Sequence, residues 1–372
     1  MASPTEVAAM RRALAFAARG PAGGANPQVG CVILDRTGGV AGEGWHRGAG
    51  TPHAEVDALA RAGGAARGGT AVVTLEPCTH TGRTGPCSQA LIDAGIARVV
   101  VGASDPNPDA AGGASVLRAA GLDVEEHVLA ADAEALNRRW LHAVRTGRPF
   151  VTWKFAGTLD GRSAAADGSS RWITNPASRA DVHARRAETG AVVVGTGTVL
   201  ADDPHLTVRD ADGRPVGRQP LRVVVGHTDV PPGARVLDDA APTLHLRTRD
   251  PHEVLAALAA REVRHVWLEG GPTLAAAFLA AGAVDEVLAY VAPALLGSGA
   301  SAVGDLGIRS IADVVRLDVT DVAVLDGDVR ITAVPVVVGP RTAAPESTTT
   351  DAAAGTAATP STPPQVPAEV SA

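Results

Sequence analysis

The stretch that decides the fold is residues 53–87, HAEVDALARAGGAARGGTAVVTLEPCTHTGRTGPC. It begins with His53-Ala54-Glu55 and ends with a segment in which eight residues separate Cys78 from Cys87. The whole chain has three cysteines, so two of them lie in this one stretch. A histidine, two thiols and a carboxylate are therefore available to a single site.

These residue types, in this order, are typical of a catalytic zinc site. Catalytic zinc takes three protein ligands and leaves a fourth position for water. His53, Cys78 and Cys87 can supply the three ligands, and the bound water then loses a proton far more easily than bulk water does. Glu55 remains free to take that proton and to deliver protons to a ring nitrogen and a departing amine. A His-x-Glu motif followed by Pro-Cys and a second cysteine is the signature of zinc deaminases.

Two simpler interpretations of the same residues stay open. The histidine and the thiols can be unrelated, or Cys78 and Cys87 can form a disulfide, although nothing in the sequence marks the chain as secreted. The third cysteine, Cys31, lies in the apolar run of residues 29–34. We expect it to be a buried core thiol and not a ligand.

Length and composition indicate a globular enzyme. The 372 residues suffice for two domains, and 45% apolar and 20% charged residues are ordinary values. The net charge of −7 argues against a nucleic-acid partner held by phosphate contacts. No apolar run approaches the roughly 20 residues of a transmembrane helix, and residues 11–19 predict an amphipathic helix and not a signal peptide. We expect a cytoplasmic enzyme with no membrane partner.

One basic residue differs from all the others. Of the 33 basic residues, 32 are arginine, and the exception is Lys154. Lysine is a compact point charge whose pKa can be shifted, whereas the guanidinium is planar and always charged. The lone lysine is either chance or the mark of a position that arginine cannot serve.

Periodicity and turn residues predict two α/β domains, residues 1–146 and 147–338, each a sheet covered by helices. For the first domain we expect helices at 5–19, 53–62, 87–94, 114–120 and 131–145, and strands at 29–34, 40–44, 71–75, 98–102 and 122–128. For the second we expect helices at 176–189, 251–260 and 273–281, and strands at 150–155, 191–195, 221–225, 243–246, 265–269, 284–291, 317–324 and 329–338. Residues 339–372, rich in Thr, Pro, Ala and Ser, predict a disordered tail.

Two strand-to-helix junctions of the second domain carry glycines, at residues 195–198 and 269–273. The backbone N–H groups that open the helix after Gly271 could cradle a phosphate. Neither junction has the third glycine of a dinucleotide-binding fingerprint, so tight turns explain the glycines equally well.

Eight motifs carry a resemblance to a known family: Asn26-Pro27-Gln28-Val29-Gly30-Cys31, His53-Ala54-Glu55, residues 77–87, Asp105-Pro106-Asn107-Pro108, Leu159-Asp160-Gly161-Arg162, Arg171-Trp172-Ile173-Thr174, residues 198–204 and Glu269-Gly270-Gly271-Pro272-Thr273. With them, residues 5–338 resemble the bifunctional deaminase–reductases of riboflavin biosynthesis. The eight-residue gap between the cysteines is similar to that of this family, whereas cytidine and tRNA deaminases use a two-residue gap.

The resemblance implies two folds and two consecutive reactions. The N-terminal domain would have a three-layer cytidine-deaminase-like fold and, with one zinc ion per chain, would deaminate 2,5-diamino-6-(5-phosphoribosylamino)pyrimidin-4(3H)-one. The C-terminal domain would have an α/β fold like that of dihydrofolate reductase. It would use NADPH to reduce the ribosyl side chain of 5-amino-6-(5-phosphoribosylamino)uracil to ribityl.

The resemblance also implies roles for individual residues. Glu55 would be catalytic in the deaminase, and Lys154 would be catalytic beside the ribose, which gives a reason for the lone lysine. The deaminase residues that would face the substrate are Asn26, His46, His80 and Arg83. Cofactor contacts in the reductase would be Trp172, Thr198, Asp202, Gly271, Pro272, Thr273, Leu274, Ala275, Ala276 and Ala277. Substrate contacts there would be Ser170, Arg186, Leu206, Arg209 and Glu269. The chain departs from the family pattern at Val225-Gly226-His227, where many members have Asp-Ser, so a cofactor contact is not carried over to that position.

Two other functions agree with parts of the sequence. A nucleic-acid base deaminase with an appended binding domain would share the zinc motif, but the acidic charge and the cysteine gap oppose it. A zinc-stabilised interaction module would leave Glu55 and the open ligand position without a role. The sequence leaves the oligomeric state open, with a homo-oligomer as one option.

Overall fold

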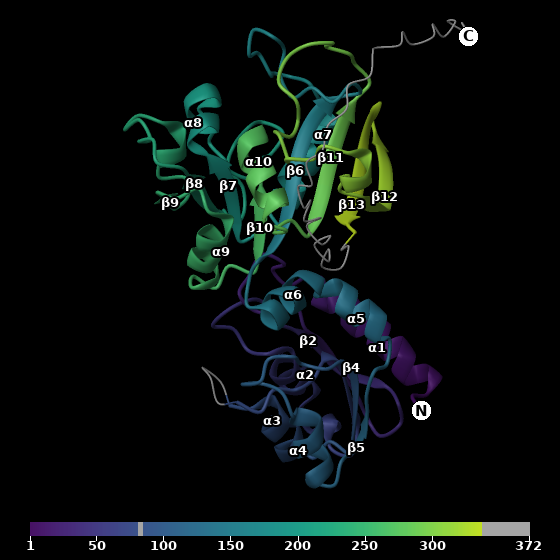
Figure 1. The fold of residues 1–372 in the computed structure, drawn as a ribbon. Helices are drawn as coiled ribbons and strands as arrows, with labels where there is room; N and C mark the ends of the chain where they lie inside the picture. Colours follow the sequence, from purple (N-terminus) through teal and green to yellow (C-terminus); the bar gives the residue numbers. More distant parts are fainter. Residues whose placement is uncertain (81–84, 337–372) are drawn as a thin grey trace, which may run out of the picture. The chain divides into compact units, whose positions relative to one another are not determined.

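The computed structural model describes residues 1–80 and 85–336, whose strands form two separate β-sheets (Figure 1). The tail predicted to be disordered, residues 339–372, lies outside the described residues, and so does Arg83. Among the helices of the described part, none combines the length and the apolar character that crossing a membrane requires.

The first sheet has five strands in the order β2-β1-β3-β4-β5. Their bounds are β1 (Gly30–Leu34), β2 (Val40–Trp45), β3 (Thr70–Leu75), β4 (Arg98–Ala103) and β5 (Asp123–Glu125). Strand β1 runs antiparallel to both β2 and β3, and the strands from β3 to β5 are parallel. The strands expected at 29–34 and 40–44 therefore form an antiparallel hairpin, and parallel α/β units follow it.

Helices cover both faces of this sheet. On one face lie α1 (Pro4–Ala17), which packs through Met10 and Ala13 on Val32 and Val72, and α5 (Ala130–Leu136), which contacts β4. The other face carries α2 (Ala54–Ala62), α3 (Cys87–Asp93) and α4 (Gly113–Ala119). Cys31 lies in the core under these three helices and is fully buried, as predicted. The three-layer arrangement expected for this part of the chain is confirmed.

Helix α2 lies unusually close to strand β2, because two glycines of the strand face it. A Cβ atom built on Gly44 would lie 2.4 Å from the carbonyl oxygen of Ala54, and one on Gly42 would lie 2.3 Å from that of Ala58. Both distances are far below van der Waals contact. The strand therefore sets the position of the helix backbone, and with it the position of the residues at the start of α2.

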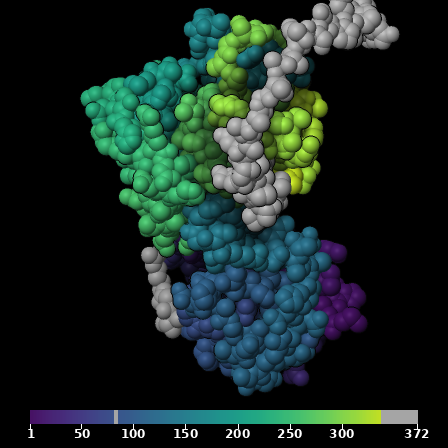
Figure 2. All heavy atoms as spheres, in the orientation of Figure 1, coloured from purple at the N-terminus to yellow at the C-terminus, as the bar shows by residue number. Residues whose placement is uncertain are grey.

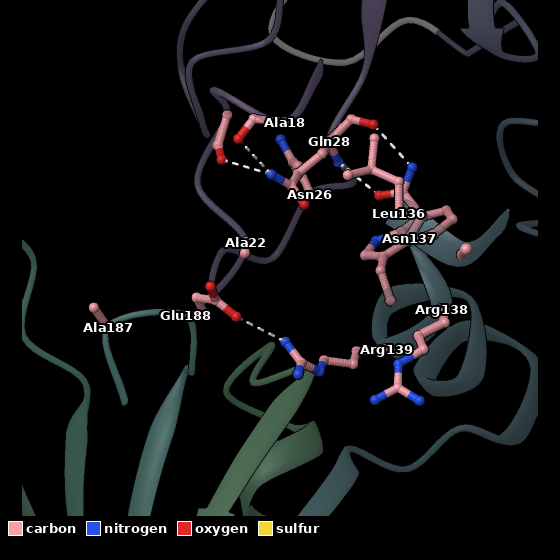
Figure 3. Close-up of a pocket in the computed structure, with 13 residues that line it drawn as sticks. Ala18, Ala22, Asn26, Gln28, Leu136, Asn137, Arg138, Arg139, Ala187 and Glu188 are labelled. Carbon is pink, nitrogen blue, oxygen red and sulfur yellow. Dashed lines mark hydrogen bonds and ion pairs between the residues drawn. The ribbon is translucent and has the colours of Figure 1, made fainter. Parts of the chain in front are cut away.

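The helix predicted over residues 131–145 is broken in the structure. It ends as α5 at Leu136 and resumes as α6 (Arg138–Thr146), with Asn137 outside helical geometry between them. The Asn137 side chain accepts the backbone N–H of Gln28 and donates to the Gln28 carbonyl, both at 2.8 Å (Figure 3). Because both partners are buried, this pair of hydrogen bonds anchors the turn that precedes β1 and explains the break.

The second sheet has eight strands in the order β12-β13-β11-β6-β10-β7-β8-β9. Their bounds are β6 (Phe150–Thr158), β7 (Ala191–Gly195), β8 (Leu221–Val225), β9 (Thr243–Leu246), β10 (His265–Leu268), β11 (Glu286–Ala292), β12 (Leu317–Leu325) and β13 (Asp328–Pro335). The strands from β11 to β9 are parallel, and β13 and β12 add an antiparallel edge. Edge strand β12 is largely exposed, and its yellow atoms lie on the surface in Figure 2.

Helices also cover both faces of the second sheet. Helices α9 (Pro251–Ala259) and α10 (Pro272–Ala280) pack on the face that includes Val193 and Leu268, and α7 (Pro176–Arg186) packs on the opposite face through Val182. One helix was not predicted: the glycine-containing segment after β7 forms the short helix α8 (Thr196–Asp202) and not only a turn. The α/β class expected for this part is confirmed.

Because α2 and β2 are in close contact, a side chain in place of Gly42 or Gly44 should destabilise the protein. We expect Gly44→Ala to lower the free energy of unfolding by about 1–3 kcal/mol, because the added methyl group has no space under Ala54. Urea unfolding followed by circular dichroism measures the change. The matched control is Gly64→Ala, where a Cβ meets nothing within 4 Å. Equal stability of the two variants would contradict the close-packing argument.

Candidate active sites

The three proposed metal ligands converge although they come from separate elements. His53 caps the N-terminus of α2, Cys87 is the first residue of α3, and Cys78 lies in the loop after β3. The Nδ1 atom of His53 lies 3.2 Å from the Cys87 Sγ atom and 3.6 Å from the Cys78 Sγ atom. All three donor atoms lie within 4.8 Å of one another. Zinc bonds of about 2.0–2.3 Å require ligand atoms this close, so the residues fit one zinc ion.

The loop that carries Cys78 is held by buried contacts. The Glu76 carboxylate accepts backbone N–H groups of Asp105, Gly112 and Ala114, which ties the loop to the start of α4. A Cβ atom on Gly113 would lie 1.8 Å from the carbonyl oxygen of Pro77, so only glycine permits this approach. The position of the cysteine is therefore fixed by the fold before any metal binds.

The two thiols differ in acidity because they interact directly. A hydrogen bond from the Cys87 thiol lowers the pKa of Cys78 to about 4, and the Cys78 thiolate in turn raises the pKa of Cys87. The hydrogen bond to Cys78 raises the pKa of His53. All three cysteines are free, which excludes the disulfide alternative in this structure. One thiolate is thus already favoured, and thiolates are the form that binds metal.

Glu55 lies two residues after His53, in the first turn of α2, and is 3% exposed. Burial raises the pKa of Glu55 to about 7. A carboxyl group with a pKa near neutrality can both accept and donate a proton under ordinary conditions. The structure therefore gives this residue the environment of an acid–base group and not that of a surface charge.

A cavity of about 610 Å³ opens beside His53, Glu55 and Cys78. Of the predicted substrate residues, Asn26, His46 and His80 line it. The Asn26 side-chain amide lies 2.9 Å from the His46 Nε2 atom, and the His46 Nδ1 atom lies 3.1 Å from the Pro52 carbonyl oxygen. Because a carbonyl only accepts, Nδ1 carries the proton and Nε2 accepts from Asn26. Burial lowers the pKa of His46, so the ring stays neutral.

In the second sheet, the strand register places Lys154 beside Glu269. Leu268, the last residue of β10, pairs with Trp153 of β6. Glu269 follows Leu268 and Lys154 follows Trp153, so these two residues are neighbours. The Nη2 atom of Arg186 donates to both carboxylate oxygens of Glu269 at 2.8 Å. Although burial alone would raise it, Arg186 and Lys154 lower the pKa of Glu269 to about 2. The carboxylate is therefore ionised and lies between two cations.

Two cations of this cluster keep their charge without an anion of their own. Within residues 1–80 and 85–336, neither the Lys154 ammonium nor the Arg209 guanidinium forms a hydrogen bond or ion pair. Burial lowers the pKa of Lys154, while the charge of Glu269 opposes that effect. Leu206, three residues before Arg209, is buried and has a left-handed backbone conformation with φ of 56°. Ser170 is half-buried. The predicted substrate residues of this domain thus include unpaired positive charge.

The predicted cofactor residues meet where two parallel strands end. Strands β7 and β10 are neighbours, and each leads directly into a helix, α8 and α10, whose N-terminus has no side-chain cap. A Cβ on Gly271 would lie 3.6 Å from the Thr198 Oγ1 atom, so Thr198 faces the start of α10, whereas Ala275 is fully buried in the core. Open helix N-termini beside glycine backbone suit the phosphates of a dinucleotide, so these residues fit NADPH.

Two further predicted cofactor residues come from the loop and helix at this edge. The Arg171 guanidinium donates to the Asp202 carbonyl oxygen, which ties the segment with Trp172 to the end of α8. The Trp172 side chain is 69% exposed and stacks on Arg179, whose guanidinium carbon lies 4.5 Å from the centroid of the indole ring. An exposed indole at this edge is available for a bound cofactor.

The departure at Gly226 has a structural reason. Gly226 has φ of 136°, and a Cβ there would lie 2.6 Å from the Thr196 Oγ1 atom. A larger residue would require the Thr196 side chain to move. The backbone of this chain at position 226 is therefore matched to glycine.

Sequence reasoning missed several residues of these sites. Asp105 and Asn107 line the cavity beside Glu55, although their Asp-Pro-Asn-Pro motif alone predicts no role. His183 lies next to the Arg209 backbone, and only its position one helical turn before Arg186 could have indicated this. Glu76 and Asn137 act through tertiary hydrogen bonds that no local pattern announces.

Comparison with known proteins agrees with this geometry. Residues 4–103 match the family model described as the cytidine and deoxycytidylate deaminase zinc-binding region, and residues 149–331 match the RibD C-terminal domain. The riboflavin biosynthesis protein RibD of Mycobacterium tuberculosis is 54% identical over 309 residues, which cover 83% of this chain and 91% of the relative. That of Escherichia coli is 43% identical over 82% of this chain and 92% of the relative.

Solved structures show the same relationship. RibD of Acinetobacter baumannii has 40% sequence identity and a TM-score of 0.82, over 89% of this chain and 99% of that one. A Thermotoga maritima protein named diaminohydroxyphosphoribosylaminopyrimidine deaminase/5-amino-6-(5-phosphoribosylamino)uracil reductase has 32% identity and a TM-score of 0.81, with the same coverage. This chain therefore belongs to the RibD family and is a bifunctional enzyme of riboflavin biosynthesis that combines a zinc-dependent deaminase with an NADPH-dependent reductase.

Proposed function

We propose that this chain deaminates 2,5-diamino-6-(5-phosphoribosylamino)pyrimidin-4(3H)-one and then reduces the ribosyl side chain of the product to ribityl. The substrates follow from the name of the Thermotoga maritima relative. We assign the deaminase to residues 1–146 and the reductase to residues 147–338, and expect a cytoplasmic enzyme. A homo-oligomer remains a prediction. The single observation that carries the proposal is the convergence of His53, Cys78 and Cys87 beside the buried carboxyl group of Glu55, which is not one of the three ligands.

In the deaminase, the chain's own residues bind the substrate and move protons. We assign His53, Cys78 and Cys87 as zinc ligands; zinc supplies a water molecule that loses its proton easily. Glu55 accepts that proton and returns protons to the ring nitrogen and to the departing ammonia. Asn26 and neutral His46 form one wall of the cavity and orient the pyrimidine, and His80 and Arg83 are assigned to the substrate as well. One water is consumed and one ammonia is released.

In the reductase, bound NADPH would supply a hydride to the ribosyl carbon, and a proton from solvent would complete the reduction. Trp172, Thr198, Asp202 and residues 271–277 are assigned to the cofactor. Lys154 lies at the centre of the sheet, where its charge can polarise the accepting carbon of the substrate. Arg209 pairs with no anion in the described part of the chain and suits the phosphate. Glu269, held by Arg186, positions the hydroxyl groups, with Ser170 and Leu206 alongside.

The first experiment is a paired assay on the purified full-length chain. The diaminopyrimidinone substrate is supplied with NADPH, and ammonia release and NADPH oxidation are recorded together. Equal yields of ammonia and oxidised cofactor are expected. Absence of both signals from zinc-loaded, folded protein would overturn the proposed substrate.

The ligand assignment predicts the metal content of single variants. We expect Cys87→Ser to reduce bound zinc from one per chain to less than about one tenth, because a serine hydroxyl rarely ionises to bind zinc. Inductively coupled plasma mass spectrometry of dialysed protein measures the content. Cys31→Ala is the control, because Cys31 lies in the core and is not one of the three residues whose donor atoms converge, so this variant should keep full zinc. Full zinc in Cys87→Ser would refute the assignment.

Glu55→Gln should separate metal binding from deamination. The amide cannot carry protons, so we expect ammonia release to fall by about 10²–10⁴-fold, with zinc content unchanged. Reduction of separately supplied 5-amino-6-(5-phosphoribosylamino)uracil should continue at the wild-type rate. Normal ammonia release would show that Glu55 is not the proton carrier and would favour a non-catalytic zinc module.

Lys154→Arg should impair the reduction and leave the deamination unchanged. The larger guanidinium cannot occupy the half-buried position beside Glu269 in the same geometry, so NADPH oxidation should fall at least about 100-fold. Ammonia release should remain at the wild-type rate, which serves as the internal control for folding. Near-normal reduction would show that Lys154 has no catalytic role.

A further inference from the structure

His183 lies within the reductase charge cluster but has no assigned role. It is on α7, three residues before Arg186, so the two side chains lie on the same face of the helix. Its Nδ1 atom lies 3.3 Å from the backbone nitrogen of Arg209, which donates to it. Because that nitrogen atom of the ring accepts, the neutral ring carries its proton on Nε2.

The segment that His183 contacts is held in a strained conformation. Leu206 adopts a left-handed backbone, with φ of 56°, which costs free energy for a non-glycine residue. Arg186 donates from Nη1 to the Thr207 carbonyl at 2.7 Å, and the Gln219 side-chain amide makes hydrogen bonds with both the N–H and the carbonyl of Val208. Together with His183, these side chains hold both peptide groups between Thr207 and Arg209.

The charges around His183 keep it neutral. Burial, and then the neighbouring charges of Arg186 and Arg209, lower the pKa of His183 to about 4. Glu269 opposes that effect, and Lys154 adds to it. The ring therefore stays an acceptor for the Arg209 N–H at neutral pH. The same three cations outnumber the one carboxylate, which leaves positive charge for an anionic group of the substrate.

We propose that His183 is a positioning residue of the reductase: by accepting the Arg209 N–H, it fixes residues 206–209 so that the Arg209 guanidinium faces the substrate phosphate. The inference rests on the proposed function, because it requires a phosphorylated substrate in this site. Two side chains of α7 then have different roles. Arg186 orients Glu269 and the Thr207 carbonyl, and His183 orients the backbone that carries the phosphate-binding arginine.

The experiment measures steady-state NADPH oxidation by the full chain with 5-amino-6-(5-phosphoribosylamino)uracil and with the same compound lacking the phosphate. His183→Leu removes the acceptor and should raise KM for the phosphorylated substrate about tenfold, the size of effect expected for one lost hydrogen bond. The value of kcat should change less than about twofold, since no reacting group is removed. His183→Asn, whose side-chain oxygen can replace Nδ1, should restore most of the affinity. Both KM for NADPH and KM for the substrate without phosphate should stay at wild-type values.

A double-mutant cycle tests whether the effect passes through Arg209. In an Arg209→Met background, His183→Leu should cause no further rise in KM, because the guanidinium that it positions is gone. His252→Leu, on the exposed surface of α9, is the matched control and should leave all constants unchanged. His183→Ala provides the same test if leucine prevents folding, which thermal unfolding reports.

Each failure has a different meaning. Wild-type enzyme that oxidises no NADPH with the phosphorylated substrate would overturn the proposed function, and the inference with it. Active wild-type enzyme with an unchanged KM in His183→Leu, or with additive effects in the double mutant, would overturn the role of His183 and leave the function intact. An equal loss with and without the phosphate would also overturn it.

Discussion

The close packing of α2 on β2 is the constraint on which the deaminase site depends. The helix brings His53 and Glu55 to one end of the sheet, and it can do so only because Gly42 and Gly44 let its backbone touch the strand. Ala54, Ala58 and Ala62 complete this contact from the helix side. The chemistry of the site therefore rests on the small size of residues that take no part in it.

The second site rests on a buried ion pair instead of on small residues. Arg186 and Glu269 form a bidentate pair between α7 and the end of β10. A carboxylate in such surroundings would be costly without its partners, and the pair fixes the geometry around Lys154. The excess of positive charge that remains is available to a ligand. Each half of the enzyme thus has a different physical basis for holding its reactive groups in place.

Much of this organisation could be predicted from the sequence. The cysteine gap and His53-Ala54-Glu55 indicated the metal site, and the apolar period of 2 or 3.6 residues indicated most elements to within a few residues. The break at Asn137 could not be predicted, because the cause is a hydrogen bond to Gln28, 109 residues away. Helix α8 was missed because glycines at 195 and 197 favour a turn locally. The segment after Leu206 is held by side chains from α7 and by Gln219. Local sequence patterns do not predict these contacts.

The hydrogen bonds between Asn137 and Gln28 have a consequence for dividing the enzyme into parts. The match to the deaminase family model ends at residue 103, and all proposed metal ligands and Glu55 precede that point. The turn that carries Asn26 and Gln28, however, is held by Asn137, which lies between α5 and α6. A fragment cut after β5 would keep the proposed metal ligands but would lack the side chain that holds the turn before β1. The side chains that hold the turn before β1 therefore extend to Asn137, well beyond the end of the matched motif.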